Sequence, residues 1–457
     1  MELTFLHLII IIFTIAVAIG GGLYAARSVK TAEGYSLGGR QSGVTLVAGS
    51  IAGTIIGGGA TVGTAQLAYS MGLSAWWFTL GSGISFIIMG LFYARPLRKT
   101  ALETIPQYLV LHYGKRAGDL ASLVSSLGIF FSAVASMLPG IQIISTVLGI
   151  SHPLAALVLL ILVAAYVFFG GMKSAGVGGI LKMIIIWISL CLAGFSAFVS
   201  LQAQPALIAV FPEHMFSLFG AGKGAALANL LSLVVGILCT QTYIQAIFSA
   251  SDPKTASIGA FAAALVTIPV GLPCAVIGMY MYAVAPGTLP ILVLPTYLLQ
   301  YEPVWLGGIA MGGIMLSLIG SIAGLSLGIG TMVSRDILSG LLKIKDGASL
   351  LRLNRFVVLG VLLVAAVVAI LNEGSQILFW NYMSMALRGG GVFLPLSMAV
   401  FFPGSLHKGW VVASIVFSTC AAIVATIIPT PVNPLFIGLG CSLIMLIPGY
   451  FLQEKAA

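Results

Sequence analysis

Long apolar runs separated by short polar segments fill almost the whole chain. A run of about 19 apolar residues is long enough to cross the hydrocarbon core of a bilayer as a helix. By this criterion the sequence predicts thirteen membrane-spanning helices, at residues 4–24, 43–69, 73–94, 119–149, 152–170, 175–202, 224–250, 256–286, 303–333, 355–372, 375–403, 408–428 and 432–452. The segments between them leave no room for a soluble domain, so residues 1–457 are expected to form one all-α transmembrane domain.

Composition and charge support this interpretation. Of the 457 residues, 60% are hydrophobic and 7% are charged, which suits a lipid environment and excludes a soluble protein. The net charge of +9 does not indicate a nucleic-acid partner, because most Lys and Arg residues fall in alternate short loops, and the opposite set of loops holds only Lys223. This asymmetry predicts a multi-pass protein of a bacterial-type inner membrane, with the N-terminus outside and the C-terminus in the cytoplasm.

The sequence carries no pattern of a metal centre or of an enzyme active site. No His, Asp or Glu lies deep in a predicted span, so a nucleophile–base pair is not expected there. The cysteines lie inside apolar segments without the spacing of metal ligands, which predicts neither a metal site, apart from a Na⁺ site considered below, nor a disulfide. They are Cys191, Cys239, Cys274, Cys420 and Cys441. We therefore expect no cofactor and no enzyme activity; a secondary transporter is the preferred class, with a channel or a transporter-like sensor as the alternatives.

Two predicted spans contain features that break a helix. Gly57, Gly58 and Gly59 lie in the middle of the second span, where unwound backbone is tolerated only if it is buried or lines a cavity. The alternative is an intact helix with a close-packed neighbour. In the seventh span, residues 239–245 place polar side chains in an otherwise apolar helix. Breaks at matching places in two spans five apart are typical of an inverted-repeat transporter.

Several motifs, in their order and spacing, resemble the sodium:solute symporter family. They are Gly38-Gly39-Arg40, Gly57-Gly58-Gly59 followed by Gly63-Thr64-Ala65, Gly170-Gly171, and the stretches 241–251 and 317–336. The resemblance implies a leucine-transporter-like fold of two inverted five-helix repeats, here residues 43–202 and 224–403. An extra helix and a cytoplasmic loop, residues 1–42, would precede the repeats, and two helices in residues 404–457 would follow. Around residues 57–65 the chain also resembles choline-carrier-like members.

The resemblance also implies a sodium site. Its oxygens would come from backbone carbonyls at the first helix break and from hydroxyl groups on the ninth span, which are suitable ligands for a hard cation. The chain departs from the family pattern at two places. Gly320 stands where a Ser or Thr is usual, and Gly178-Gly179 followed by Lys182 stands where many relatives have Thr-Asp and then Gln. The matching cation-site positions are Gly53, Ile56, Ser317, Gly320 and Ser321.

Lys182 and Arg388 are the two formal charges clearly inside predicted spans. An intramembrane charge costs at least a few kcal/mol, so a functional role is the first hypothesis for each. Lys182 could simply reach toward the cytoplasmic surface. We favour the hypothesis that its amine occupies the place of the sodium ion, because two cations a few ångströms apart would repel each other. Such a lysine can take up and release protons, so H⁺ is the predicted coupling ion, with Na⁺ at the family site as the alternative.

Arg388 bears on the substrate. Its guanidinium could pair with a substrate carboxylate or bond backbone carbonyls at a gate, and both remain open. Because no acidic residue lies deep in the spans to neutralise this charge, we expect a small anionic or zwitterionic organic solute, bound by a protein that works as a monomer. Choline is not expected, because the positions that align with the tryptophans of choline carriers are Ile55, Ser132 and Thr240. The predicted substrate-binding residues are Gly57, Gly58, Gly59, Ser132, Thr240, Gln241, Tyr243, Asn381 and Arg388.

Overall fold

Helices make up nearly all of the chain. The computed structural model describes residues 4–26, 31–167, 171–344, 346–428, 430 and 432–452. Within these residues the only β pairing is an isolated bridge between Ser42 and Ala250. Nine helical segments of the described part are long and apolar enough to cross a membrane, or ten if one bent helix pair counts as a span. These findings confirm an all-α polytopic membrane protein.

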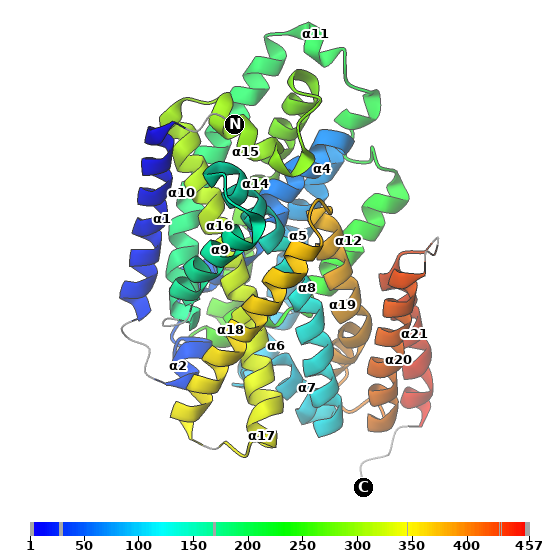
Figure 1. Cartoon of the computed structure of the whole chain (residues 1–457). Helices are drawn as coiled ribbons and strands as arrows, with labels where there is room; N and C mark the ends of the chain where they lie inside the picture. Colours follow the sequence, from blue (N-terminus) through cyan, green and yellow to red (C-terminus); the bar gives the residue numbers. More distant parts are fainter. Residues whose placement is uncertain are drawn as a thin grey trace.

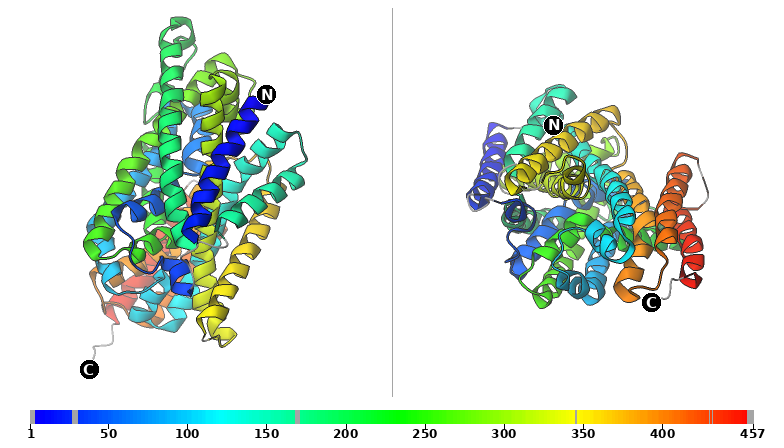
Figure 2. Two further views of the ribbon diagram at one scale, coloured as in Figure 1. Left: turned by 90° about the vertical axis from the view of Figure 1, so that its left-hand side faces the viewer. Right: turned by 90° about the horizontal axis from the view of Figure 1, so that it is seen from below.

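Most of the long helices run side by side along one axis (Figure 1). These are α1 (Phe5–Ala26), α8 (Lys115–Leu148), α9 (His152–Val167), α10 (Gly171–Gln202), α14 (Pro253–Val284), α16 (Val304–Met332), α18 (Gly347–Leu371), α19 (Ile377–Phe401), α20 (Lys408–Ile427) and α21 (Pro434–Phe451). The shorter helices are α2 (Ala32–Leu37), α3 (Val44–Ile55), α4 (Thr64–Met71), α5 (Trp77–Ile88), α6 (Ala94–Lys99), α7 (Ile105–Tyr113), α11 (Pro205–Ile208), α12 (Lys223–Leu238), α13 (Gln241–Ser249), α15 (Val293–Gln300) and α17 (Ser339–Leu341). The start of α1 and the end of α21 lie at opposite ends of the bundle (Figure 1). Seen from below, α1 and the pair α20–α21 occupy opposite edges of it (Figure 2).

Local sequence signals set the ends of several helices. The side chain of Asp252 accepts hydrogen bonds from the amides of Lys254 and Thr255, and Pro253 follows as the first helical residue, so α14 begins there. Gly149 ends α8 in the left-handed conformation, with φ of 64°. These caps satisfy backbone groups that a helix end leaves without partners.

The helix break expected at the glycine cluster is present. Helix α3 ends at Ile55, where the ψ angle of Ile56 is 78°, and a turn leads to the π-helical segment η1 (Gly59–Gly63) and then to α4. Glycine is needed at this turn, because a Cβ on Gly57 would lie 2.1 Å from the hydroxyl oxygen of Ser321 on α16. The interrupted backbone can therefore lie directly against α16.

A second break separates α12 from α13. The two helices meet at 49°, and Cys239 and Thr240 lie between them. The hydroxyl of Thr240 donates to the carbonyl of Gly236, 2.7 Å away, at the end of α12. The backbone amide of Cys239 donates to the same carbonyl, so this acceptor at the end of α12 is satisfied within the break itself.

Glycines bring α10 unusually close to α3. A Cβ on Gly179 would lie 2.2 Å from the carbonyl oxygen of Gly49, and a Cβ on Gly53 would lie 2.8 Å from the Cα of Gly179. Small residues of this kind allow two membrane helices to approach backbone to backbone. The approach places Lys182, one turn further along α10, beside the break after α3.

Candidate functional site

The buried side chain of Lys182 reaches the broken end of α3. Lys182 is 1% exposed, and its Nζ donates to the carbonyl of Ile56 at 3.1 Å and to the carbonyl of Ser317 at 3.2 Å. The hydroxyl of Ser317 donates to the same Ile56 carbonyl. The amine therefore bridges the helix break and α16.

The other residues of the predicted cation site surround this amine. A Cβ on Gly320 would lie 3.0 Å from Nζ of Lys182, and a Cβ on Gly53 would lie 3.7 Å from its Cε. Ser321 follows on α16, and its hydroxyl donates to the carbonyl of Thr54. The structure thus brings together Lys182 and the five positions that the family pattern indicates. The absence of a side chain at residue 320 leaves the space that the amine uses.

A small buried cavity lies beside the same break. About 20 Å³ of it is open to the centres of water-sized molecules, which is room for roughly one water. All of its lining residues are buried, so the cavity lies in the interior of the bundle. They are Thr54, Ile55, Gly57, Gly59, Phe78, Ser132, Ser136, Tyr243, Leu325, Asn381, Met385 and Arg388.

Arg388 supplies the positive charge of this cavity. Arg388 is 1% exposed. Its Nε donates to the carbonyl of Gly236 at 3.1 Å, and its Nη1 donates to the hydroxyl of Ser384 at 2.9 Å. The other terminal nitrogen has no hydrogen-bond partner within the described residues, and no carboxylate lines the cavity. The guanidinium keeps spare donors that suit a carboxylate.

The predicted substrate-binding residues divide between the cavity and its surroundings. Gly57, Gly59, Ser132, Tyr243, Asn381 and Arg388 line the cavity, whereas Gly58, Thr240 and Gln241 do not. A Cβ on Gly58 would meet Pro139 and Leu318, so this glycine serves the packing of the turn against α8 and α16. The lining residues that the sequence analysis did not assign to the site include Phe78 and Ser136. Ser136 lies one turn after Ser132 on α8, and this helical spacing was the signal that could have identified it.

Gln241 instead joins a polar network at the end of the bundle where α2 and α7 lie (Figure 1). Its side chain donates to the carbonyl of Glu103 at 2.8 Å and accepts from the amide of Ile105 at 2.9 Å. The carboxylate of Glu103 forms ion pairs with Arg335 and Arg40. Burial raises the pKa of Glu103, and the charges of Arg335 and Arg40 act in the opposite direction. The network ties α7 and the π-helical segment η6 (Val333–Leu338), which follows α16, to the start of α13.

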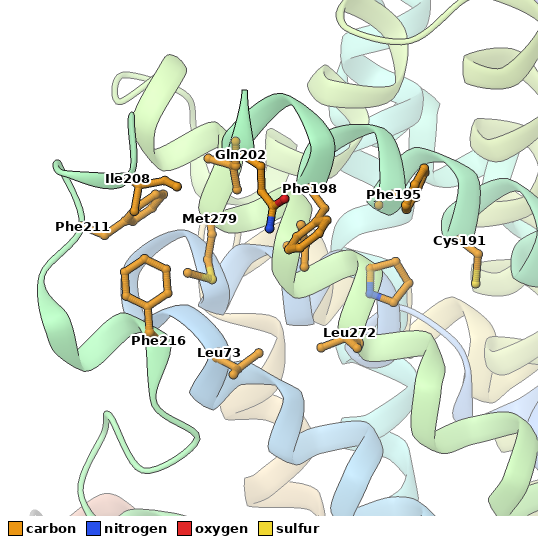
Figure 3. Close-up of a pocket in the computed structure, with 14 residues that line it drawn as sticks. Leu73, Cys191, Phe195, Phe198, Gln202, Ile208, Phe211, Phe216, Leu272 and Met279 are labelled. Atoms are coloured by element: carbon orange, nitrogen blue, oxygen red, sulfur yellow. The ribbon is translucent and has the colours of Figure 1, made fainter. Parts of the chain in front are cut away.

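A larger pocket lies between α10 and α14 but lacks the features of a solute site. Its volume is about 540 Å³, and Figure 3 shows an almost wholly apolar lining that includes Phe195, Phe198 and Leu272. These three residues are 66%, 44% and 38% exposed, so the pocket opens on the apolar outer surface of the bundle. A solute site needs convergent polar groups, and the side chain of Gln202 is the one amide in this lining.

Comparisons with known proteins agree on the type of protein. Residues 35–416 match the model of the sodium:solute symporter family. The high affinity choline transporter 1 of Homo sapiens is 26% identical over 279 residues, which cover 56% of this chain and 47% of that protein. The sodium/glucose cotransporter of Vibrio parahaemolyticus is 26% identical over 177 residues, covering 38% of this chain and 33% of that protein. The matches thus span about half or less of these relatives' length.

Solved structures share the fold over nearly the whole chain. A Na⁺-coupled sialic acid symporter, solved in a substrate-bound outward-open state, superposes with a TM-score of 0.83 at 16% identity, covering 98% of this chain and 97% of that one. A nucleobase-cation-symport-1 family transporter, in a closed conformation, gives a TM-score of 0.60 at 13% identity, covering 90% and 92%. At these identities the likeness establishes the fold alone.

Proposed function

We propose that this chain, which belongs to the sodium:solute symporter family, is a secondary active symporter that imports a small carboxylate-bearing solute and uses Lys182 for coupling. The family is one of cation-coupled solute transporters and not of enzymes. The observation that carries the specific proposal is the buried amine of Lys182, which bonds the Ile56 carbonyl at the helix break.

We further propose a thirteen-span arrangement in the plasma membrane. The spans would be α1, α3 with α4, α5, α8, α9, α10, α12 with α13, α14, α16, α18, α19, α20 and α21. Residues 43–202 and 224–403 would form the two inverted repeats, and the broken pairs α3–α4 and α12–α13 would begin them. An odd number of spans is consistent with the start of α1 and the end of α21, which lie at opposite ends of the bundle (Figure 1). The one-sided distribution of Lys and Arg supports an outside N-terminus and a cytoplasmic C-terminus.

In the proposed coupling, the protonated amine of Lys182 takes the role of the bound cation. As an ammonium it holds the carbonyls of Ile56 and Ser317 and so keeps the broken helix against α16. Loss of the proton removes the charge that strengthens both hydrogen bonds, and α3 is then free to separate from α16. Proton release toward one side of the membrane would thereby favour the conformation open to that side.

Sodium coupling is the alternative, because the family implies Na⁺ as the coupling ion. The geometry around Lys182 argues against it. A sodium ion bonded to the Ile56 carbonyl would lie a few ångströms from the ammonium, and repulsion between unit charges about 4 Å apart is about 4 kcal/mol at an effective dielectric constant near 20.

The substrate class rests on Arg388. Its unpartnered terminal nitrogen and the side chains of Ser132, Ser136 and Asn381 line the same buried cavity. A guanidinium with spare donors in a site without acidic groups favours a carboxylate. A choline-like cation is the second candidate, favoured by the similarity to choline transporters and by Phe78 and Tyr243 in the cavity wall, but the charge of Arg388 opposes it.

Two experiments test these proposals. A thermal-shift screen of small carboxylic acids, amino acids, sugars and choline against purified protein should show stabilisation by carboxylates, and this should be lost in Arg388→Ala. Stabilisation by choline and not by any carboxylate would contradict the substrate proposal.

Uptake of the solute identified in this way is then measured in liposomes, first with a proton gradient and no Na⁺, then with a Na⁺ gradient at uniform pH. We expect uptake only in the first condition, and its loss in Lys182→Gln but not in the control Lys223→Gln at the exposed start of α12. Uptake driven by Na⁺ alone would contradict coupling through Lys182.

A further inference from the structure

A basic pocket lies at the ends of α8 and α20, remote from the site described above. Its volume is about 490 Å³, and its lining includes Tyr113, Lys115, Arg116, Lys408 and Val412. Helices α8 and α20 are in contact with each other. The pocket occupies the end of the bundle where α2 and α7 lie (Figure 1), which is the cytoplasmic end in the proposed orientation.

Three cationic side chains of this pocket lack a counter-ion. Lys115, Arg116 and Lys408 are exposed, and none of them takes part in an ion pair within the described residues. The nearest acidic group along α8 is Asp119, which likewise forms no ion pair there. The first turns of both helices add their positive ends. The capping residue of α8, Gly114, supplies no side-chain acceptor, whereas the ring of His407 accepts from the amide of Gly409 at the start of α20. Among the described residues, the pocket thus concentrates positive charge without an ion-pair partner.

Exposed apolar residues continue from the pocket along both helices. On α8, Leu123 and Leu127 lie seven and eleven residues after Arg116, on the same helical face. They are 60% and 42% exposed. On α20, Val416 lies one turn after Val412 and is 37% exposed. A ligand with an anionic head and an apolar tail matches this sequence of basic and apolar surface.

We propose that this pocket binds the phosphate headgroup of an anionic phospholipid, whose acyl chains lie along Leu123, Leu127 and Val416. The phosphate accepts hydrogen bonds from Lys115, Arg116 and Lys408. Basic clusters at the membrane surface attract anionic lipids, and each Lys or Arg adds to the attraction. The exposed apolar residues Leu123, Leu127 and Val416 favour a lipid over free phosphate, because only a ligand with acyl chains would cover them. Since α8 also carries Ser132 and Ser136, the bound lipid would fix one end of a helix that lines the solute cavity.

The test measures thermal unfolding of the purified full chain in a neutral detergent. Phosphatidylglycerol, phosphatidylcholine with the same acyl chains, and inorganic phosphate are each titrated into the wild type. The same titrations use the triple variant Lys115→Gln/Arg116→Gln/Lys408→Gln and a control variant of equal charge change, Lys99→Gln/Lys254→Gln/Arg352→Gln. The control residues are exposed cations at the same end of the bundle.

We expect phosphatidylglycerol alone to stabilise the wild type and the control variant, and the apparent affinity of the pocket variant to fall at least tenfold. Equal unfolding temperatures in phosphatidylcholine show that the pocket variant is folded. Unchanged affinity in the pocket variant, or an equal loss in the control variant, would overturn the proposal. Equal stabilisation by inorganic phosphate would replace the lipid with a soluble anion and overturn it as well.

Discussion

The double variant Lys182→Gln/Gly320→Ser asks whether a tethered ammonium has taken the place of a sodium ion. In the wild type, a Cβ on residue 320 would lie 3.0 Å from Nζ of Lys182, so a serine there competes with the amine for space. Gln is shorter and neutral, and it removes both the contact and the charge. The two substitutions together also return a hydroxyl oxygen to α16, beside the carbonyl of Ile56.

The expected effects follow from the charges and the oxygens of the site. Removing the ammonium abolishes a repulsion of about 4 kcal/mol on a cation about 4 Å away, which corresponds to roughly a thousandfold gain in Na⁺ affinity. If the double variant binds Na⁺ with a dissociation constant near 10 mM, then 100 mM Na⁺ stabilises it by about 1.4 kcal/mol. The wild type should show no such stabilisation.

The assay is thermal unfolding of purified protein in 100 mM NaCl compared with 100 mM KCl. The double variant should unfold at a higher temperature in NaCl, while the wild type, Lys182→Gln, Gly320→Ser and the α10 control Ser189→Ala define the background. Gly320→Ser should be more destabilising beside Lys182 than beside Gln, so the two substitutions should not be additive. Equal Na⁺ stabilisation of the wild type and the double variant would refute the reasoning.

Three other substitutions test the break, the polar network and a helix cap. Gly57→Ala should abolish transport, because its Cβ would lie 2.1 Å from the Ser321 hydroxyl oxygen, and adding Ser321→Gly should restore part of the uptake. Gln241→Ala should leave solute-induced thermal shifts unchanged but increase labelling of a cysteine introduced at Ile105, because the tie between α7 and α13 is lost. The hydroxyl of Thr255, with nearby amides, holds the pKa of Asp252 below 3.8. The contribution of the Asp252 carboxylate to stability is therefore present above pH 3.8 and is lost as the pH falls below that value. Asp252→Asn should therefore be less stable than the wild type at pH 6 but lose less stability between pH 6 and pH 3, as measured by denaturant unfolding.

The sequence predicted the all-helical membrane fold, and the glycine cluster predicted the break after α3, because both depend on local properties of the chain. The contact of Lys182 with Gly320 and Ile56 was predicted from the spacing of family motifs, because the hydrophobic periodicity of the helices does not indicate it. It depends on the close approach of α10 to α3, which the glycines at residues 49, 53 and 179 permit. That approach is a tertiary property.

The hydrogen-bond partners of Gln241 could not be predicted from the sequence. Its place on the broken seventh span made it a candidate substrate-binding residue, which stays a prediction, and in the structure its side chain bonds Glu103 and Ile105. Its direction depends on the 49° bend between α12 and α13, which turns its side chain toward Glu103 and Ile105. Neither the bend angle nor the distant partner has a signature in the residues around position 241. Phe78 lines the cavity, and the sequence could not predict this. An aromatic residue in an apolar helix shows the same pattern whether it lines a cavity or packs against a neighbouring helix.

The carbonyl of Gly236 accepts hydrogen bonds from three donors: the guanidinium of Arg388, the hydroxyl of Thr240 and the backbone amide of Cys239. If an arriving carboxylate draws the guanidinium away, the threonine hydroxyl remains as a partner, and the end of α12 is not left with an unsatisfied acceptor. The guanidinium of Arg388 can therefore exchange one hydrogen-bond partner for another without leaving the Gly236 carbonyl unsatisfied. Capture and release of a charged solute would then require only a side-chain rotation, while the second helix break keeps its shape throughout the cycle.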